Sequence, residues 1–308
     1  MITVTLLGTG ALSPTPERAL AVTALTVSGR TLLADCGEGT QIAMRRHHIS
    51  PLRIDVIALT HYHGDHILGL PGLMQTMFQE QRRTPLLIVG PGNVREQLAP
   101  IMTLAGKLPY EVMVRELPPE GLKLDEVFGW TDGALLSAFP TRHTDISQGY
   151  CLSLPRRGKF DPARAASLSV PQKQWGRLQK GETVTLPDGR TVLPEQVMGS
   201  ARRGLRVTVS GDTSPCASLT KAAENADLLI MDGTYADDKD TAMALSRGHS
   251  TFTLAARTAK EASARRLWLT HFSQSVTDPE SYLPQTKTIF ENTRCGIDGL
   301  SVTLRFDS

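Results

Sequence analysis

The chain has 308 residues, of which 40% are hydrophobic and 21% are charged, a composition typical of a soluble globular protein. No apolar run approaches the ~20 residues that a membrane span needs. The N-terminal residues MITVTLLGTG lack the basic segment of a signal peptide. A membrane protein and an exported protein are therefore not expected, and we expect a cytoplasmic location.

Charge is unevenly distributed, although the formal net charge is only +2. Residues 155–206 contain 11 Lys and Arg against 4 Asp and Glu, whereas the rest of the chain contains 22 against 27. One segment is basic and the remainder is mildly acidic. This pattern favours a polyanion-binding element, and solvated charge on a protruding loop is an equally good interpretation.

The first quarter of the chain alternates short β-rich runs with turns, and strand and helix patterns alternate later. The predicted strands are residues 2–7, 21–27, 31–34, 54–60, 86–89, 111–116, 135–140, 149–154, 205–210, 227–231, 266–270 and 300–305. The predicted helices are residues 38–47, 67–80, 93–104, 215–225, 251–264 and 279–291. This order predicts an α/β protein with two mixed sheets covered by helices.

Residues 155–204 interrupt that alternation with Arg, Lys, Pro and Gly, and only a short helical piece is predicted, near residues 161–168. We therefore predict one domain over residues 1–308, from which residues 155–204 project as an inserted flexible arm. No internal repeat or low-complexity tract is evident, which excludes a solenoid and a disordered chain.

The four cysteines form no Cys-x-x-Cys pair of the kind that holds structural zinc. They are Cys36, Cys151, Cys216 and Cys295. In a chain without an export signal, we expect buried free thiols. Any metal site must then be built from His and Asp.

Four possible metal ligands follow the apolar strand IDVIALT in the segment HYHGDH. His61 and His63, two residues apart, can face one ion, while Asp65 and His66 can face a neighbouring one. Gly64 permits the tight turn between them. Lone histidines are usually structural, but four ligand types this dense indicate a metal site.

Three more candidates follow other predicted strands: His143, Asp212 and His271. Taken alone, each is as readily a hydrogen-bonded loop residue. Their shared position beyond strand ends favours a common site. Asp212 is suited to bridging two ions ~3.5–4 Å apart, the spacing of a two-metal clamp on attacking and leaving oxygens.

At this point the sequence resembles a known family. The segment HYHGDH with its downstream partners resembles the metallo-β-lactamase superfamily, and other segments resemble its ribonuclease Z (tRNA 3′-processing endonuclease) branch. These segments are LLGTGALSPTPER, DCGEGTQ, GLPGLM, SGDT, GHST and THFS. The resemblance covers nearly the whole chain, and it implies a four-layer αββα sandwich with an inserted basic arm.

Carried over to this sequence, the resemblance implies two zinc ions per chain held by seven side chains. One ion has the ligands His61, His63 and His143, the other has Asp65, His66 and His271, and Asp212 bridges the two.

The resemblance also implies roles in catalysis. Asp65 orients or deprotonates the attacking water besides binding metal, and His249 in GHST acts as the general acid. Without the family, His249 is as readily an ordinary residue at the start of the 251–264 helix, capped by Ser250 or Thr251. Asp35 supports the metal ligands from outside the coordination sphere.

The implied function is that of a zinc-dependent endoribonuclease which removes the 3′ trailer from precursor tRNA by means of a metal-activated hydroxide; the implied assembly is a homodimer. The arm would grip the tRNA backbone, a contact that is independent of sequence and sensitive to salt. Its candidate substrate contacts are Arg156, Arg157, Lys159, Lys173, Trp175, Arg177 and Lys180. For Trp175, stacking on a sugar or base competes with the more common role of a hydrophobic anchor.

Two segments depart from the family pattern. The arm usually has a Gly/Pro-rich stretch where this chain reads VPQKQWGRLQKG, and an Arg-Tyr pair usually follows THFS where this chain has Ser275 and Val276 after Gln274. These departures support an alternative function, that of a zinc phosphodiesterase or other metallo-hydrolase acting on a smaller substrate. A nucleic-acid-binding protein with a vestigial site is a third interpretation, against which the complete ligand set argues.

Overall fold

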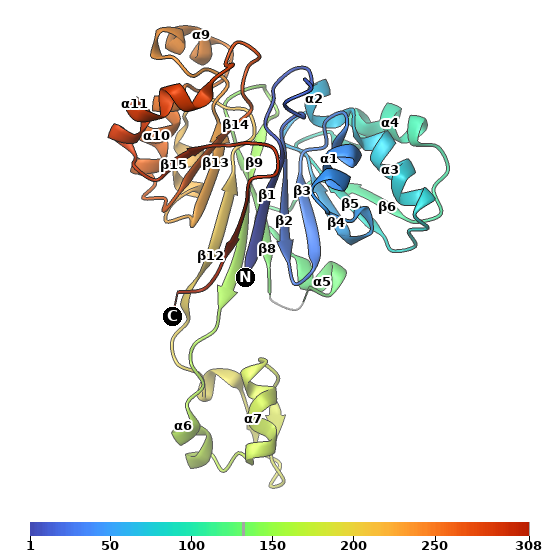
Figure 1. Ribbon diagram of the computed structural model, residues 1–308. Helices are drawn as coiled ribbons and strands as arrows, with labels where there is room; N and C mark the ends of the chain where they lie inside the picture. The colour runs from blue at the N-terminus through green and yellow to red at the C-terminus, as the bar shows by residue number, and fades with distance from the viewer. Residues whose placement is uncertain (131–132, 308) are drawn as a thin grey trace. The chain divides into compact units, whose positions relative to one another are not determined.

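The computed structural model describes residues 1–130 and 133–307. By contacts it divides into two compact units, each described here by itself (Figure 1). Unit 1 comprises Met1–Leu154 and Leu205–Arg305, and unit 2 comprises Pro155–Gly204 and Phe306–Ser308. Among the helices of the described chain, none has the length and apolar content to cross a membrane.

The first sheet of unit 1 has the strand order β16-β1-β2-β3-β4-β5-β6. Its strands are β1 (Ile2–Gly8), β2 (Val22–Val27), β3 (Arg30–Ala34), β4 (Ile54–Ala58), β5 (Leu86–Val89), β6 (Val112–Arg115) and β16 (Ser301–Leu304). Strand β1 is antiparallel to β2 and β16, whereas β3, β4, β5 and β6 run parallel. The sheet is therefore mixed, as predicted.

The second sheet of unit 1 has the order β15-β14-β13-β12-β9-β8-β7. Its strands are β7 (Leu122–Lys123), β8 (Leu135–Pro140), β9 (Gln148–Arg156), β12 (Arg202–Val209), β13 (Leu228–Asp232), β14 (Leu267–Thr270) and β15 (Thr293–Cys295). Strands β12 to β15 are parallel, and β7 to β9 are antiparallel. Parallel neighbours have their carboxyl ends at the same edge, which matters for the site below.

Helices cover the outer faces of both sheets (Figure 1). Helices α1 (Thr40–Arg46), α3 (Leu70–Gln79) and α4 (Val94–Ala105) lie on the first sheet, and α8 (Ala217–Ala222), α10 (Phe252–Glu261) and α11 (Leu283–Ile289) lie on the second. Every residue of β4 and β13 is buried, because these central strands are covered on both faces. The predicted two mixed sheets covered by helices are thus confirmed.

The predicted helix over residues 67–80 is divided into α2 (Gly64–Ile67) and α3. Pro71 lies in the first turn of α3, where its missing N–H costs nothing. At Gly69 a Cβ atom would lie 1.9 Å from the carbonyl oxygen of Gly37, so the chain approaches too closely for any side chain. Among the short elements, α5 (Leu124–Phe128), α9 (Thr241–Ser246) and β15 escaped prediction because five or six residues show little periodicity.

Unit 2 has its own elements and its own small core. It contains α6 (Pro162–Ser167), α7 (Gln172–Gln179), a hairpin of β10 (Val184–Thr185) and β11 (Thr191–Val192), and a short 3-10 helix, Pro194–Gln196. Its buried core consists of Ala165, Val170, Leu178, Val184, Leu186, Val192 and Val197. The sequence predicted α6 but not α7, whose apolar residues are few.

A buried tyrosine ties the two sheets of unit 1 together. The Tyr150 hydroxyl, on β9, donates to the carbonyl oxygen of Leu59 beyond β4 at 2.7 Å and accepts from Gln148 Nε2 at 2.6 Å. Replacing Tyr150 with Phe leaves a buried carbonyl without this donor.

We predict that Tyr150→Phe lowers the free energy of unfolding by about 1–3 kcal/mol, the usual cost of an unsatisfied buried group. Denaturant unfolding would measure it. The matched control is Tyr282→Phe, at a half-buried position whose hydroxyl makes no recorded hydrogen bond in the described chain. Equal losses in the two variants would contradict the proposed tie between the sheets.

Candidate metal centre

The histidine motif lies where β4 leaves the first sheet. Buried His61 comes three residues after the strand, and His63 is the N-cap residue of α2. Because α2 begins at Gly64, Asp65 and His66 fall in its first turn, and both side chains are directed to the same place as His61. The local sequence therefore presents four potential ligands from one short connection.

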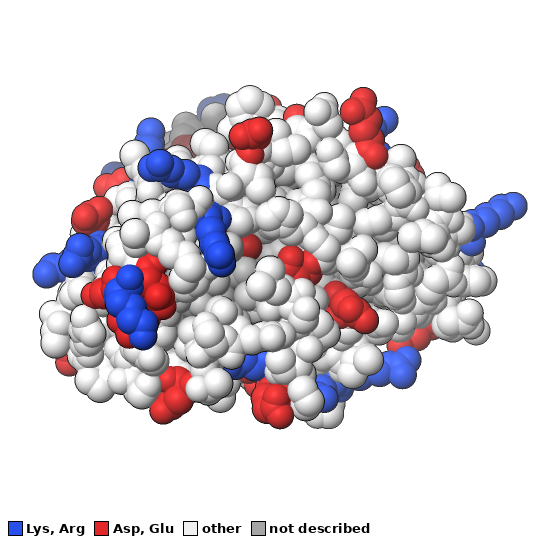
Figure 2. Space-filling view, turned by 90° about the horizontal axis from the view of Figure 1, so that it is seen from above, with Lys and Arg blue, Asp and Glu red and all other residues white. Residues whose placement is uncertain are grey.

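The other three candidates come from the second sheet, each just beyond a strand. His143 follows β8, Asp212 follows β12 and His271 follows β14. The parallel strands of this sheet end at one edge, so the loops after β12 and β14 are neighbours. Figure 2 looks down on this end of the molecule and shows acidic side chains beside a hollow, with Lys and Arg side chains around it.

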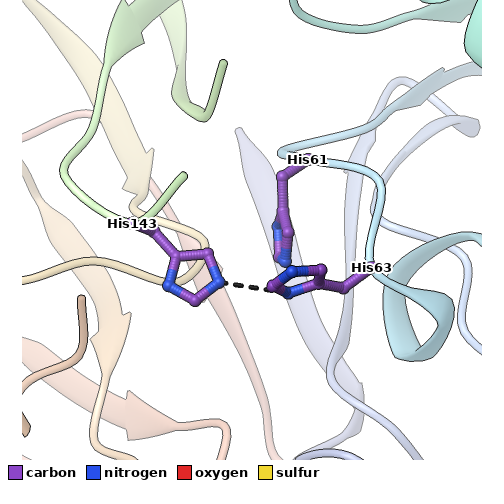
Figure 3. Close-up of side chains that lie close together, drawn as sticks. All are labelled: His61, His63 and His143. Atoms are coloured by element: carbon purple, nitrogen blue, oxygen red, sulfur yellow. Dashed lines mark hydrogen bonds between the residues drawn. The ribbon is translucent and has the colours of Figure 1, made fainter. Parts of the chain in front are cut away.

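Two groups of three side chains converge there. In the first, His61, His63 and His143 point toward one another (Figure 3), with ligand atoms within 4.8 Å and a His143 Nε2 to His63 Nδ1 distance of 3.2 Å. The second group has the same 4.8 Å limit and consists of Asp65, His66 and His271.

Asp212 lies between the two groups. Its Oδ2 atom is 3.2 Å from His271 Nε2 and 3.4 Å from His66 Nε2, both of the second group. The same oxygen is 3.8 Å from the Nε2 atoms of His61 and His143, both of the first. One carboxylate thus faces both groups, as a bridging ligand must.

Two buried atoms of this cluster have no hydrogen-bond partner in the described chain: His61 Nε2 and Asp212 Oδ1. Leaving such atoms unsatisfied costs free energy, and metal coordination removes that cost. Imidazole nitrogen and carboxylate oxygen together suit zinc and similar divalent ions. The buried cluster therefore has the features of a metal site.

Hydrogen bonds at Nδ1 orient four of the histidines so that Nε2 faces the centre. The Nδ1 partners are Thr60 Oγ1 for His61 (3.1 Å), Asp35 Oδ2 for His66 (2.8 Å), the Gly248 carbonyl oxygen for His143 (3.1 Å) and Thr234 Oγ1 for His271 (2.9 Å). Outer partners of this kind fix the tautomer and rotation of metal-binding histidines. Asp35 lies where the sequence analysis expected a supporting residue.

The surroundings also set protonation. Burial lowers the pKa of His61 to about 2, helped by the neighbouring imidazoles. Burial works against ionisation of Asp212, but the charges of His271 and His66 hold its pKa well below the usual range. Burial likewise opposes ionisation of Asp65, and the hydrogen bond with His271 still lowers its pKa. A neutral imidazole and ionised carboxylates are the forms that bind metal.

His249 lies beside the cluster, in the loop before α10. Its ring centroid is 4.7 Å from that of His143, and its Nδ1 donates to Asp232 Oδ2 at 2.7 Å. Burial lowers the pKa of His249, but the Asp232 carboxylate outweighs burial and raises it. The ring is therefore held in one orientation and favoured in its protonated form.

Sequence reasoning missed Asp232, which is fully buried and also accepts hydrogen bonds from the amides of Thr213 and Thr234. A signal was present: Asp232 ends the strand LLIMD, as Asp212 follows VTVS. The strand-end rule that identified Asp212 points to Asp232 as well.

All seven candidate substrate contacts belong to unit 2. The Trp175 indole packs against Phe160, with centroids 5.3 Å apart, and donates to the Val170 carbonyl oxygen at 2.9 Å, an arrangement typical of an anchor. Arg177 forms an ion pair with Glu182 at 2.9 Å.

The other candidates in unit 2 differ in their partners. Arg156 stacks on the Phe306 ring, 5.2 Å from its centroid. Lys159, Lys173 and Lys180 are exposed and make no ion pair within the described residues. Arg157 makes only a weak contact with a carbonyl oxygen, at 3.4 Å.

Comparison with known proteins places this arrangement. The family model described as "Anti-Pycsar protein Apyc1" matches residues 2–160, and the one described as "Beta-lactamase superfamily domain" matches residues 154–272. Ribonuclease Z of Agathobacter rectalis is 41% identical, and that of Lachnoclostridium phytofermentans 38%; each alignment covers 100% of this chain and 99% of the relative. A crystal structure of human tRNase Z, short form, is 28% identical with a TM-score of 0.69, covering 99% of this chain and 100% of that one.

The identity of these relatives over their full length, the two mixed sheets and the buried His and Asp cluster agree with one another. The chain belongs to the ribonuclease Z family of the metallo-β-lactamase superfamily.

Proposed function

We propose that this protein is a zinc-dependent endoribonuclease that cleaves the 3′ trailer from precursor tRNA. Full-length relatives named ribonuclease Z support this substrate. The observation that carries the proposal is the buried cluster around Asp212, whose Oδ1 atom lacks a partner in the described chain.

Seven side chains would hold two zinc ions. His61, His63 and His143 would bind one, Asp65, His66 and His271 the other, and Asp212 both. When bound, such a pair lowers the pKa of a water toward ~7 and stabilises charge on the phosphate oxygens.

The remaining steps belong to the chain's own residues. Asp65, held by the Leu12 amide at 2.9 Å from its Oδ2, orients the attacking water. His249 gives a proton to the departing ribose 3′-oxygen, a task suited to a group that is protonated near neutral pH. Asp232 positions that imidazole and favours its charged form.

Unit 2 is proposed as the inserted arm of a four-layer αββα sandwich, and as the part that binds the tRNA backbone. Its unpaired cations support contact with phosphates, whereas the packing of Trp175 favours an anchoring role over base stacking. The homodimer and the cytoplasmic location stay predictions; sedimentation of the purified protein would test the first and cell fractionation the second.

Metal analysis tests the centre. Protein purified without chelator should contain two zinc ions per chain, and Asp212→Ala should lose or weaken both, because its carboxylate faces both groups. Asp145→Ala, at an exposed position two residues after His143, is the matched control and should keep both ions. A folded full-length protein that takes up no transition metal would rule out the metal centre.

Activity of two variants tests the proton donor. His249→Ala should keep its metals and slow pre-tRNA cleavage by ~10²–10⁴, the usual contribution of a positioned acid. Asp232→Asn should cause a smaller loss and move the basic limb of the pH–rate profile to lower pH, because loss of the carboxylate lowers the pKa of His249.

The matched control is His48→Asn, at an exposed position on the first sheet's side, which should leave the profile unchanged. Loss of a zinc ion in His249→Ala would instead make His249 a ligand.

Charge removal tests unit 2. Neutralising its four cations without ion pairs should weaken pre-tRNA binding and reduce the slope of log affinity against log salt by ~0.7–0.9 for each lost phosphate contact. The changes are Arg157→Gln, Lys159→Gln, Lys173→Gln and Lys180→Gln. Hydrolysis of a small phosphodiester should persist, because it depends on unit 1 alone.

The control for charge neutralises three cations of the same unit that are paired with carboxylates: Arg164, Arg177 and Arg190. Its effect should be smaller. Unchanged affinity and salt slope in the first variant would favour the smaller-substrate function instead.

A further inference from the structure

An arginine with no assigned role lies beside the proposed proton donor. Arg247 is the C-cap residue of α9, two residues before His249, and its side chain is exposed. Its Nη1 atom donates to the Tyr235 hydroxyl at 3.1 Å, and no ion pair joins it to a carboxylate in the described chain. The guanidinium is therefore held in place while most of its N–H groups stay available.

Tyr235 is the residue that holds it there. Its ring is buried and lies edge-on to His249, with centroids 6.3 Å apart. Its amide donates to the Ser250 carbonyl oxygen, and its backbone pairs with Thr251, so the loop that carries His249 also fixes Tyr235. The Tyr235 hydroxyl has no other recorded bond among described residues, which leaves its proton free to donate.

The turn between the two functional side chains is constrained. Gly248 has φ +72°, and a Cβ there would lie 2.7 Å from His143 Cα. The segment from Arg247 to His249 is thus pressed against the metal centre, and the positions of the guanidinium and the imidazole are coupled.

Another arginine near the centre is already engaged. Arg18 donates to the Val276 carbonyl oxygen at 2.7 Å and lies over the Phe272 ring, 5.4 Å from its centroid. Arg247, in contrast, offers a rigid fork of N–H groups of the kind that binds phosphate with two parallel hydrogen bonds.

We propose that Arg247, positioned by Tyr235, binds the backbone phosphate on the 5′ side of the nucleotide whose 3′-oxygen leaves. The inference rests on the proposed function, because His249 marks the side of the departing ribose. A single-stranded RNA has a phosphate there, whereas a small diester with one phosphate has none. Arg247 therefore determines specificity for polynucleotide over small diester and takes no part in bond breaking.

The test compares two substrates in the zinc-loaded, full-length protein. Arg247→Gln should lower kcat/KM for pre-tRNA by about tenfold to a hundredfold, mainly through KM, the range expected for one ionic hydrogen-bonded contact. Its salt slope should fall by about 0.7, one single-strand phosphate. Hydrolysis of bis(p-nitrophenyl) phosphate should stay at the wild-type rate.

Two further variants refine the result. Arg247→Lys keeps the charge but loses the fork, so it should recover the salt slope and only part of kcat/KM. Tyr235→Phe should cause a smaller loss of the same kind, again on pre-tRNA alone. Arg257→Gln, at an exposed position on α10, is the matched control and should match wild type on both substrates.

Equal losses on both substrates in Arg247→Gln would show a structural effect through His249 and overturn the inference, as would no loss on either. If the wild-type protein hydrolyses the small diester but leaves pre-tRNA intact, the proposed function fails separately. Binding of a short single-stranded RNA then decides the role of Arg247: weaker binding with a flatter salt slope in Arg247→Gln supports it, and unchanged binding refutes it.

Discussion

Around one oxygen of Asp212, four imidazole nitrogens lie within 3.8 Å. Bringing such groups together away from water costs free energy unless each is ionised or neutral as required and is held by partners. The Nδ1 hydrogen bonds supply those partners, and the depressed pKa values of His61 and Asp212 provide the required charges. The shape of the strand ends, the loops and the outer hydrogen bonds all depend on this requirement.

Both sheets of unit 1 must contribute, because no single strand end can surround a pair of ions. The contact between them is close at Gly211, where φ is +63° and a Cβ would lie 2.6 Å from Thr60 Cβ. Thr60 precedes His61 on one sheet, and Gly211 precedes Asp212 on the other. Glycine at this position lets ligands from different sheets reach the same centre, and the Tyr150 hydrogen bond holds the sheets in register nearby.

Division into two units separates two physical tasks. Unit 1 has the geometry for bond cleavage, which demands fixed positions and controlled protonation. Unit 2 has a small core of its own that includes the packed Trp175, and its unpaired cations suit backbone contact, which demands charge more than exact position. Arg247 would link the tasks, since it lies in unit 1 yet recognises a feature that only a polynucleotide has.

The sequence by itself determined the two mixed sheets, the family and the seven candidate ligands, because strand periodicity and dense HYHGDH spacing are local properties. It also marked residues 155–204 as a basic segment. Only the tertiary structure decided that Asp232 orients His249, that Trp175 packs in a core, and that Arg247 lies beside Tyr235. Those relations join residues through chain folding and burial, and side-chain packing between distant or differently turned segments leaves no periodic signal in the sequence.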